Sequence, residues 1–188
     1  MSRSQRLILT IAILASSVAF LDGTLINVAL PAIETELGGG LTTQQWVVDA
    51  YLITLGSLIL LAGSISDAFG RLLVLRIGLY GFAAASVVIA IAPDPVILII
   101  ARAVQGAAGA FLVPSSLALI TSRFDGAMRG RAIGIWTAMT TGAMIVGPLI
   151  GGVFVDYLSW RFAFVINVVP IGITLWLLHT LGERDERR

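Results

Sequence analysis

Two charged residues, Asp22 and Arg102, lie inside long apolar stretches of the sequence and offer its most informative chemistry. Asp22 falls late in the stretch 7–30, and Arg102 falls early in the stretch 96–121. If both stretches cross a bilayer, each charge would cost about 2.5–3.5 kcal/mol in lipid even on a permissive insertion scale. We therefore expect both side chains to face protein or a water-filled cavity.

The two charges also lie at similar depths. At about 1.5 Å of rise per helical residue, Asp22 lies about 12 Å below Leu30, and Arg102 lies about 9 Å below Val96. Each charge is much cheaper to bury beside the other. A carboxyl group favours its neutral form when buried and its charged form near an arginine, so movement between states could bind and release a proton. The alternative is a static ion pair, and proton-driven transport by an Asp22→Asn variant would separate the two.

Four other polar residues are candidates to line a substrate cavity: Asn27, Gln105, Asp49 and Tyr51. Gln105 lies three residues after Arg102 and shares roughly one helix face with it. Asn27 could equally form a hydrogen bond between helices. Asp49 and Tyr51 begin the second apolar stretch, where Tyr51 could instead be an interfacial anchor and Asp49 could simply be hydrated.

Six apolar stretches must carry these residues. They run over residues 7–30, 47–65, 72–92, 96–121, 132–155 and 162–181. A helix needs about 20 apolar residues to cross a bilayer, and backbone groups in lipid must be hydrogen-bonded internally. Barrel strands would be about half as long and would alternate in polarity. The sequence therefore predicts an all-α polytopic membrane protein with six transmembrane helices.

Composition supports a membrane protein and disfavours several other classes. Hydrophobic residues make up 57% of the 188 residues and charged residues 12%, against about 25% charged in soluble domains. The net charge of +1 suggests no nucleic-acid partner. There is no cysteine, and the single histidine, His179, cannot form a zinc site with its neighbours. No Ser/His/Asp set, metal cluster or phosphate-binding loop is recognisable, so we expect no catalytic or metal-binding residues.

The arginines are distributed unevenly between the two sides of these segments. One side would carry Arg3, Arg6, Arg71, Arg76, Arg123, Arg129, Arg131, Arg184, Arg187 and Arg188. The opposite side would carry only Arg161. Since arginine-rich connections stay in the cytoplasm, we expect both termini to be cytoplasmic. The first stretch is not a signal peptide on this interpretation, because it continues to residue 30 and five more follow.

A short charged pattern separates the second and third stretches. Gly63, Asp67, Gly70 and Arg71 are expected to form a very short loop at the membrane surface. The two glycines would allow the backbone to turn tightly and to approach a neighbouring helix closely.

The fifth stretch contains several small residues and one proline: Gly134, Ala143, Gly147, Pro148, Gly151 and Gly152. Gly147 and Gly151 share a helix face at a spacing that lets two helices touch backbone to backbone. Pro148 removes a helix hydrogen bond and is expected to kink the helix. The stretch is either a packing seam alone or a seam on which a rocking transporter would move.

Taken in order, these patterns resemble the major facilitator superfamily, in particular the fourteen-span branch of its drug:proton antiporters. Residues 21–31 are similar to that branch's first-helix motif and 63–71 to the superfamily's signature loop. Residues 102–106 are similar to the fourth-helix motif, and 134–152 to the antiporter motif of the fifth helix. Two positions depart from the patterns: Leu72 follows Arg71 where a second basic residue is common, and Ala143 replaces a glycine.

The resemblance implies proton-coupled export of drugs or similar amphiphilic compounds across a bacterial inner membrane, driven by the proton gradient and without a cofactor. It implies a role in proton transfer for Arg102, beside which the depth argument places Asp22 as the second proton-coupling candidate. It also implies that Asp67 and Arg71 contact an opposite bundle on the cytoplasmic side and stabilise the outward-facing state. The six helices would form one bundle of two inverted three-helix repeats, with the first and fourth spans as counterparts.

Transport in this family takes two bundles with the substrate between them, and this sequence accounts for one. We therefore interpret residues 1–188 as an N-terminal six-helix bundle, with the C-terminal bundle absent. Its expected partners are the bilayer, a small-molecule substrate, and either a second half of six or eight helices or another copy of the chain. The alternative is a membrane module that does not transport but dimerises or regulates a full transporter.

Overall fold

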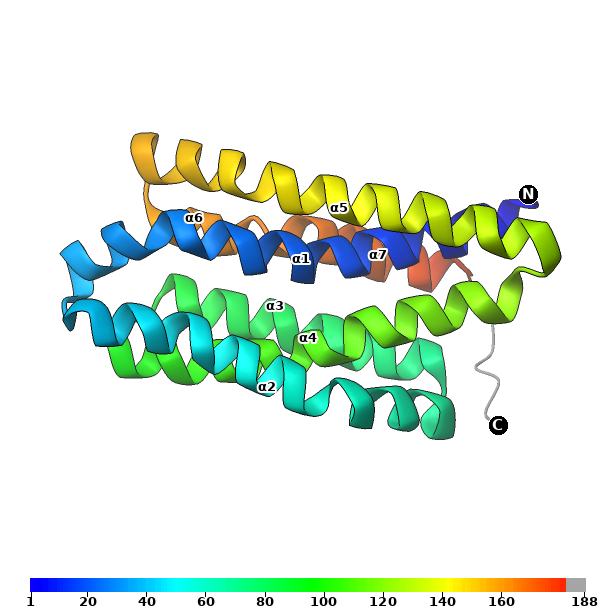
Figure 1. Cartoon of the computed structure of the whole chain (residues 1–188), viewed down its shortest axis with the longest axis horizontal. Coiled ribbons are helices and arrows are strands. Elements are labelled where there is room, and N and C mark those ends of the chain that lie inside the picture. Colours follow the sequence, from blue (N-terminus) through cyan, green and yellow to red (C-terminus); the bar gives the residue numbers. More distant parts are fainter. Residues whose placement is uncertain (182–188) are drawn as a thin grey trace.

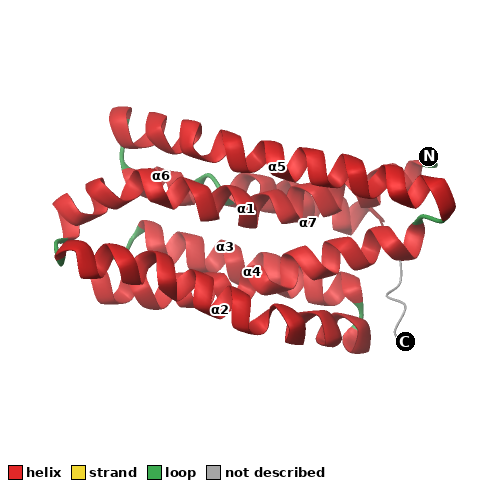
Figure 2. Cartoon of the chain, in the orientation of Figure 1, coloured by secondary structure: helices red, strands yellow, loops and turns green. Residues whose placement is uncertain are grey.

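The computed structural model describes residues 1–181, and regular structure in that range is entirely helical (Figure 1 and Figure 2). The helices are α1 (Arg3–Leu37), α2 (Gly40–Phe69), α3 (Arg71–Ala90), α4 (Pro95–Arg123), α5 (Gly126–Tyr157), α6 (Trp160–Val165) and α7 (Val168–Leu181). Six segments are long and apolar enough to cross a membrane, and α6 and α7 together make the sixth. This confirms the predicted all-α class with six spans.

Both α1 and α4 begin at side-chain caps that the sequence supplies. Ser2 Oγ accepts a hydrogen bond from the Gln5 backbone N–H, and the Gln5 side chain accepts one from the Ser2 backbone N–H at the start of α1. Asp94 accepts from the N–H groups of Val96 and Ile97 at the start of α4. These caps satisfy N–H groups that a first helical turn leaves without partners.

The helices extend beyond the predicted apolar stretches. α1 continues past Glu34 and Glu36, and α5 begins before Arg129. Hydropathy identifies only the part of a helix that lies in hydrocarbon, whereas the helical hydrogen bonds can continue into the headgroup region.

The sixth span differs from the uninterrupted stretch that the sequence predicts. α6 ends at Val165, Ile166 and Asn167 form a turn, and α7 then begins at Val168. Pro170 has no N–H to donate to the Ile166 carbonyl, and its ring crowds that group. The Ile166 carbonyl accepts from the Val169 N–H at 3.1 Å instead. The interruption between α6 and α7 therefore follows from Pro170 in the first turn of α7.

The connection between α2 and α3 is a single residue, Gly70, with a φ of 105° that favours glycine. Asp67 lies in the last turn of α2 and Arg71 is the first residue of α3, so they flank the turn. Gly63 lies inside α2, and no atom is within 4 Å of where its Cβ would be. The predicted part of Gly63 in the turn is therefore wrong, and among the described residues no helix packs closely against it.

The helix pairs follow a repeated pattern. α1 packs along α5 and α2 packs along α4 (Figure 1). Exchanging α1 with α4 and α2 with α5 turns one pair into the other. In the same way, α3 packs on α4, while α6 and α7, which together correspond to α3, pack on α1. Because α4 is the third span after α1, the two helices run in opposite directions, as two inverted three-helix repeats require.

Glycines permit close approach in both of these pairs. A Cβ on Gly106 of α4 would overlap the Tyr51 carbonyl oxygen of α2. On α5, a Cβ on Gly147 would lie 2.9 Å from the Leu21 carbonyl oxygen of α1, and one on Gly151 would lie 3.1 Å from Leu25. The predicted Gly147–Gly151 seam is therefore a contact with the α1 backbone.

The other residues of the fifth-helix pattern pack differently. The Cβ position of Gly134 has no atom within 4 Å, and that of Gly152 only meets Val28, at 4.0 Å. α5 remains a continuous helix through Pro148. The close packing predicted for this helix is thus confined to one turn.

The start of α1, the α2–α3 junction and the α4–α5 connection lie at one end of the bundle (Figure 1). The predicted arginines at 184, 187 and 188 lie outside the described residues. α2 and α5 bury the smallest share of their apolar residues within the chain. On these helices Leu60 is 86% exposed and Leu149 67% exposed, so two of the six spans keep large apolar faces open.

Candidate functional site

Asp22 lies at the centre of a buried polar cluster that joins α1, α4 and the turn between α6 and α7. Its Oδ2 accepts from Arg102 Nη1 at 2.5 Å. Its Oδ1 accepts from Gln105 Nε2 at 3.1 Å and from Asn167 Nδ2 at 2.7 Å. Asp22, Arg102 and Gln105 are fully buried, and Asn167 is 1% exposed. Both carboxyl oxygens thus face donors, which suits an ionised Asp22.

Arg102 has favourable partners besides Asp22. Its Nε donates to the Val47 carbonyl oxygen at 3.0 Å, and Nη1 also donates to Gln105 Oε1 at 2.6 Å. Its guanidinium carbon lies 4.2 Å from the centre of the Tyr51 ring. A cation over an aromatic ring is stabilised by about 0.5–2 kcal/mol. The arginine is therefore held by α2 and α4 as well as by α1.

The packing of neighbouring helices fixes this geometry. Gly106 directly follows Gln105 and brings α4 against the Tyr51 backbone of α2. The Tyr51 hydroxyl donates to the Ala19 carbonyl oxygen of α1 at 3.1 Å, one turn before Asp22. Gln105 Nε2 also donates to Ser86 Oγ of α3 at 2.9 Å. Four helices therefore contribute to the orientation of one carboxylate.

Two polar atoms of the cluster have no hydrogen-bond partner among the described residues. They are Arg102 Nη2 and Asn167 Oδ1, and both are buried. Buried polar atoms without partners are uncommon, because each forfeits its hydration. The cluster therefore retains an unused donor on Arg102 and an unused acceptor on Asn167.

Asn167 was not among the residues that sequence analysis proposed for the site. An amide in an otherwise apolar span, three residues before Pro170, was the available signal. Neither feature says that the side chain reaches the first span. The contact arises because the α6–α7 turn places Asn167 beside α1, 145 positions from Asp22 in sequence.

The four predicted cavity residues separate in the structure. Tyr51 lines a depression of about 310 Å³ between α1, α2, α4 and α5, whose other walls include Phe20, Leu52 and Met144. Gln105 is buried in the polar cluster instead. Asn27 and Asp49 are both exposed, and neither belongs to the cluster or to the walls of this depression. In this structure Gln105, Asn27 and Asp49 therefore do not line the depression beside Tyr51.

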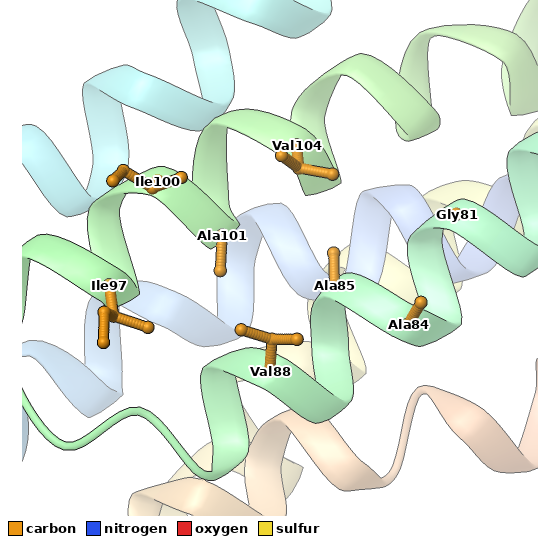
Figure 3. Close-up of a pocket in the computed structure, with 8 residues that line it drawn as sticks. All are labelled: Gly81, Ala84, Ala85, Val88, Ile97, Ile100, Ala101 and Val104. Carbon is orange, nitrogen blue, oxygen red and sulfur yellow. The ribbon is translucent and has the colours of Figure 1, made fainter.

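A second concavity, of about 320 Å³, lies between α3 and α4 (Figure 3). Ala85 and Val88 of α3 face Ala101 of α4, and its remaining lining residues are also apolar. It contains no group that could orient a polar substrate. Within residues 1–181 there is also no group of three His, Asp or Glu side chains that could hold a metal ion.

Asp67 and Arg71 pair with each other at the α2–α3 junction. Arg71 Nε and Nη2 donate to Asp67 Oδ1 at 3.1 and 2.9 Å, and Nη1 donates to the Ala118 carbonyl oxygen of α4 at 3.2 Å. The Asp67 side chain is 59% exposed. This pair is therefore open at the end of the bundle, and its contact with a second bundle stays a prediction.

Residues 12–188 match the family model described as Major Facilitator Superfamily. The chain belongs to this superfamily. Membership in a superfamily of transporters agrees with the prediction that the chain is not an enzyme, and it supports a multi-pass membrane protein whose surroundings are a lipid bilayer.

Individual relatives in the superfamily are resistance and efflux proteins. The puromycin resistance protein pur8 of Streptomyces alboniger is 41% identical over 180 residues, which cover 95% of this chain and 36% of that protein. The multidrug efflux pump LfrA of Mycolicibacterium smegmatis is 39% identical over 171 residues, or 89% of this chain and 34% of that protein. The chain thus spans about a third of the length of these curated relatives.

Two solved transporter structures have the same arrangement of helices. A D-xylose-proton symporter superposes with a TM-score of 0.80 at 21% identity, over 94% of this chain and 48% of that one. A peptide transporter, POT, superposes with a TM-score of 0.82 at 14% identity, over 93% and 38%. At these identities the likeness shows the fold alone.

Proposed function

We propose that this chain is the N-terminal bundle of an exporter that exchanges protons for drugs or other small amphiphilic organic compounds. The observation that carries the proposal is the buried Asp22–Arg102 pair with its surrounding donors. The relatives named for puromycin resistance and multidrug efflux support export. The largely apolar depression beside Tyr51 suits an amphiphilic compound.

Asp22 is the proposed proton-binding group. A proton on Asp22 would remove the negative charge that Arg102 Nη1 now contacts. Arg102 would still keep its hydrogen bonds to the Val47 carbonyl and to Gln105, and its position over the Tyr51 ring. Removing one partner of a buried ion pair usually leaves a costly bare charge. The extra partners of Arg102 reduce that cost, which favours a proton-coupling role over a static pair.

The proposed transporter needs a second bundle across the open faces of α2 and α5. Those helices are the least buried spans among the described residues. At the α2–α3 junction, where a second bundle would approach, the Asp67 side chain is 59% exposed and the Arg71 side chain is 20% exposed. The greater length of the curated relatives supports a second half of this kind. Another copy of the chain is the alternative partner.

We place the protein in a bacterial inner membrane with both termini in the cytoplasm. The end of the bundle that carries Arg71, Arg123 and Arg129 is also the end at which α1 starts (Figure 1). Arg161 lies at the other end, where it pairs with Glu36 at 2.7 Å. Arginine-rich ends are retained in the cytoplasm, which supports this orientation.

The test is proton-driven uptake of a fluorescent cationic dye into inside-out vesicles. The chain alone is compared with the chain co-expressed with a matching C-terminal half. Each preparation is repeated with Asp22→Asn, and with Asp125→Asn as the matched control, because the Asp125 side chain is 95% exposed at the end of the bundle.

Uptake that requires the second half and is lost only in Asp22→Asn is the expected result. Uptake by the chain alone would mean that two copies form the transporter. Unchanged uptake by Asp22→Asn would make the pair a static one and overturn the proton-coupling role. No uptake in either preparation would favour a module that does not itself transport.

A further inference from the structure

Asn167 contacts Asp22 through only one end of its side-chain amide. Nδ2 donates to Asp22 Oδ1 at 2.7 Å, while Oδ1 of the amide is buried without a partner. The nitrogen must face a carboxylate, because an amide oxygen there would bring two acceptors together. The structure therefore shows the orientation that matches an ionised Asp22.

A protonated Asp22 would need a hydrogen-bond acceptor in the same place. Its Oδ2 faces Arg102 Nη1, and arginine can only donate, so the proton must reside on Oδ1. Gln105 cannot turn to accept it, because its own oxygen is held by Arg102 Nη1 at 2.6 Å. The Tyr51 hydroxyl lies at the Ala19 carbonyl oxygen and forms no hydrogen bond with Asp22. Asn167 holds the unused acceptor.

We propose that Asn167 is a positioning residue that reports and stabilises both protonation states of Asp22, by donating from Nδ2 to the carboxylate and, after the amide rotates, accepting at Oδ1 from the protonated carboxyl. This inference rests on the proposed function, since it takes Asp22 as the proton-binding group. The proton is transferred from a hydronium ion of the aqueous phase: one O–H bond of hydronium breaks, one O–H bond forms on Asp22 Oδ1, and a neutral water molecule is left. The χ2 angle of asparagine has a broad, roughly two-fold preference, so the rotation needs no change of backbone.

The position of Asn167 in the chain connects the rotation of its amide to helix α7. The residue lies in the two-residue turn at which the sixth span is interrupted. Its backbone carbonyl accepts from the Ile171 N–H in the first turn of α7, at 3.3 Å. Rotation of the Asn167 amide would therefore take place between α6 and α7, where the helix is already interrupted. Its backbone is hydrogen-bonded directly to α7.

Few other side chains near Asp22 could respond to its protonation in the way proposed for Asn167. The charged and titratable groups around Asp22 are Arg102 from α4 and Tyr51 from α2, and the neutral polar neighbours are Gln105 and, behind it, Ser86 of α3. Arg102 can only donate, the Gln105 oxygen is held by Arg102, and neither the Tyr51 hydroxyl nor Ser86 forms a hydrogen bond with the carboxyl. A spectral change at Asp22 on titration is therefore attributable to Asp22 and Asn167.

The test is infrared difference spectroscopy between alkaline and acidic pH on the full chain in lipid nanodiscs. Acidification of the parent is expected to produce a protonated-carboxyl C=O band that Asp22→Asn abolishes. In Asn167→Leu this band should shift to higher frequency, because the carboxyl O–H has lost its acceptor. Asn167→Thr, whose hydroxyl can donate and accept, should restore the parent position. Asn27→Leu is the matched control, since Asn27 is exposed and outside the cluster, and it should leave the band unmoved.

Isotope labelling gives a readout that needs no change at Asn167. The sequence contains only two asparagines, Asn27 and Asn167, so side-chain 13C label on asparagine in the Asn27→Leu background reports Asn167 alone. Its amide C=O band should move to lower frequency on acidification, and it should stay fixed when Asp22→Asn is added.

The outcomes separate this inference from the proposed function. An Asp22-dependent carboxyl band that keeps its position in Asn167→Leu, or an Asn167 amide band that ignores acidification, would overturn the inference and leave Asp22 as the proton site. Absence of any Asp22-dependent band would overturn the proton site and the inference together. A shift at both groups supports both.

Discussion

Arg102 Nη1 donates to Asp22 Oδ2 across 2.5 Å, and both side chains are fully buried although they are 80 positions apart in sequence. The contact ties α1 to α4, the two helices that the repeat pattern makes counterparts. A pair of this kind has a defined energetic behaviour. Removing one partner is costly, whereas removing both charges together is often nearly neutral.

The first prediction therefore concerns stability. Arg102→Gln should lower the free energy of unfolding by about 3–5 kcal/mol, because it leaves the Asp22 carboxylate buried without a cation. The double variant Asp22→Asn with Arg102→Gln should recover most of this loss but should not transport. Thermal unfolding in detergent measures the stability. Arg131→Gln is the control, since Arg131 is exposed on α5 and surface substitutions of this kind change stability by about 0.5 kcal/mol or less. A double variant as unstable as Arg102→Gln alone would contradict the argument.

The second prediction concerns the contact between α5 and α1. Gly147→Ala should destabilise the bundle by about 1–3 kcal/mol, because the added Cβ would lie 2.9 Å from the Leu21 carbonyl oxygen and closer still to Thr24. Gly134→Ala is the control on the same helix, since nothing lies within 4 Å of its Cβ position. The same unfolding measurement compares them. Equal stabilities for the two variants would show that the Gly147 contact yields without cost.

These two sites also show why some features follow from the sequence and others do not. Asp22 and Arg102 could be proposed as partners because a lone charge in an apolar span is expensive and the first and fourth spans each hold one. The contact between their side chains is a finding of the structure. An amide is much cheaper to bury than a charge, so Asn167 in its apolar span did not demand a partner. Its contact with Asp22 depends on the α6–α7 break, which became visible only in three dimensions.

The glycines illustrate a second limit. A glycine in a sequence can form a turn, can pack closely against another helix, or can do neither. The absence of a side chain allows close approach, but it does not determine whether another helix is near. Gly70 turns the chain and Gly147 touches α1, but Gly63 and Gly134 have open space where a side chain would be. Spacing predicted the Gly147–Gly151 seam because two glycines on one face define a surface. A single glycine does not.

The third prediction concerns Arg161, which sequence analysis used only to assign the sides of the membrane. Its Nη1 donates to the carbonyl oxygens of Ala90 and Ala92, both at 2.9 Å, and its Nη2 contacts Glu36 at 2.7 Å. It therefore joins the end of α3 to α1 and α6. Arg161→Gln should lower the free energy of unfolding by about 1.5–3 kcal/mol, as expected for loss of charged hydrogen bonds.

The Arg161 measurement has an internal control in Arg131→Gln, which changes an exposed arginine on α5 and should leave stability within about 0.5 kcal/mol. High salt should reduce the difference in unfolding free energy only in part, because it screens the two hydrogen bonds to Glu36 but not the two to the carbonyls of Ala90 and Ala92. Equal effects of Arg161→Gln and Arg131→Gln on the free energy of unfolding would contradict a structural role for the Arg161 contacts.

The fourth prediction concerns orientation, and the absence of cysteine from the sequence makes it direct. Thr42→Cys places a thiol at the exposed start of α2, and Met128→Cys places one at the exposed start of α5, at the opposite end of the bundle. With both termini cytoplasmic, a membrane-impermeant maleimide added to intact cells should label the first variant and not the second. Permeabilised cells should show labelling of both, which establishes that each thiol is accessible. The reverse pattern in intact cells would invert the topology, and labelling of both would indicate that the chain inserts in two orientations. Either result would remove the arginine distribution as a guide to this protein, whereas the expected one places Asp67 and Arg71 on the cytoplasmic side.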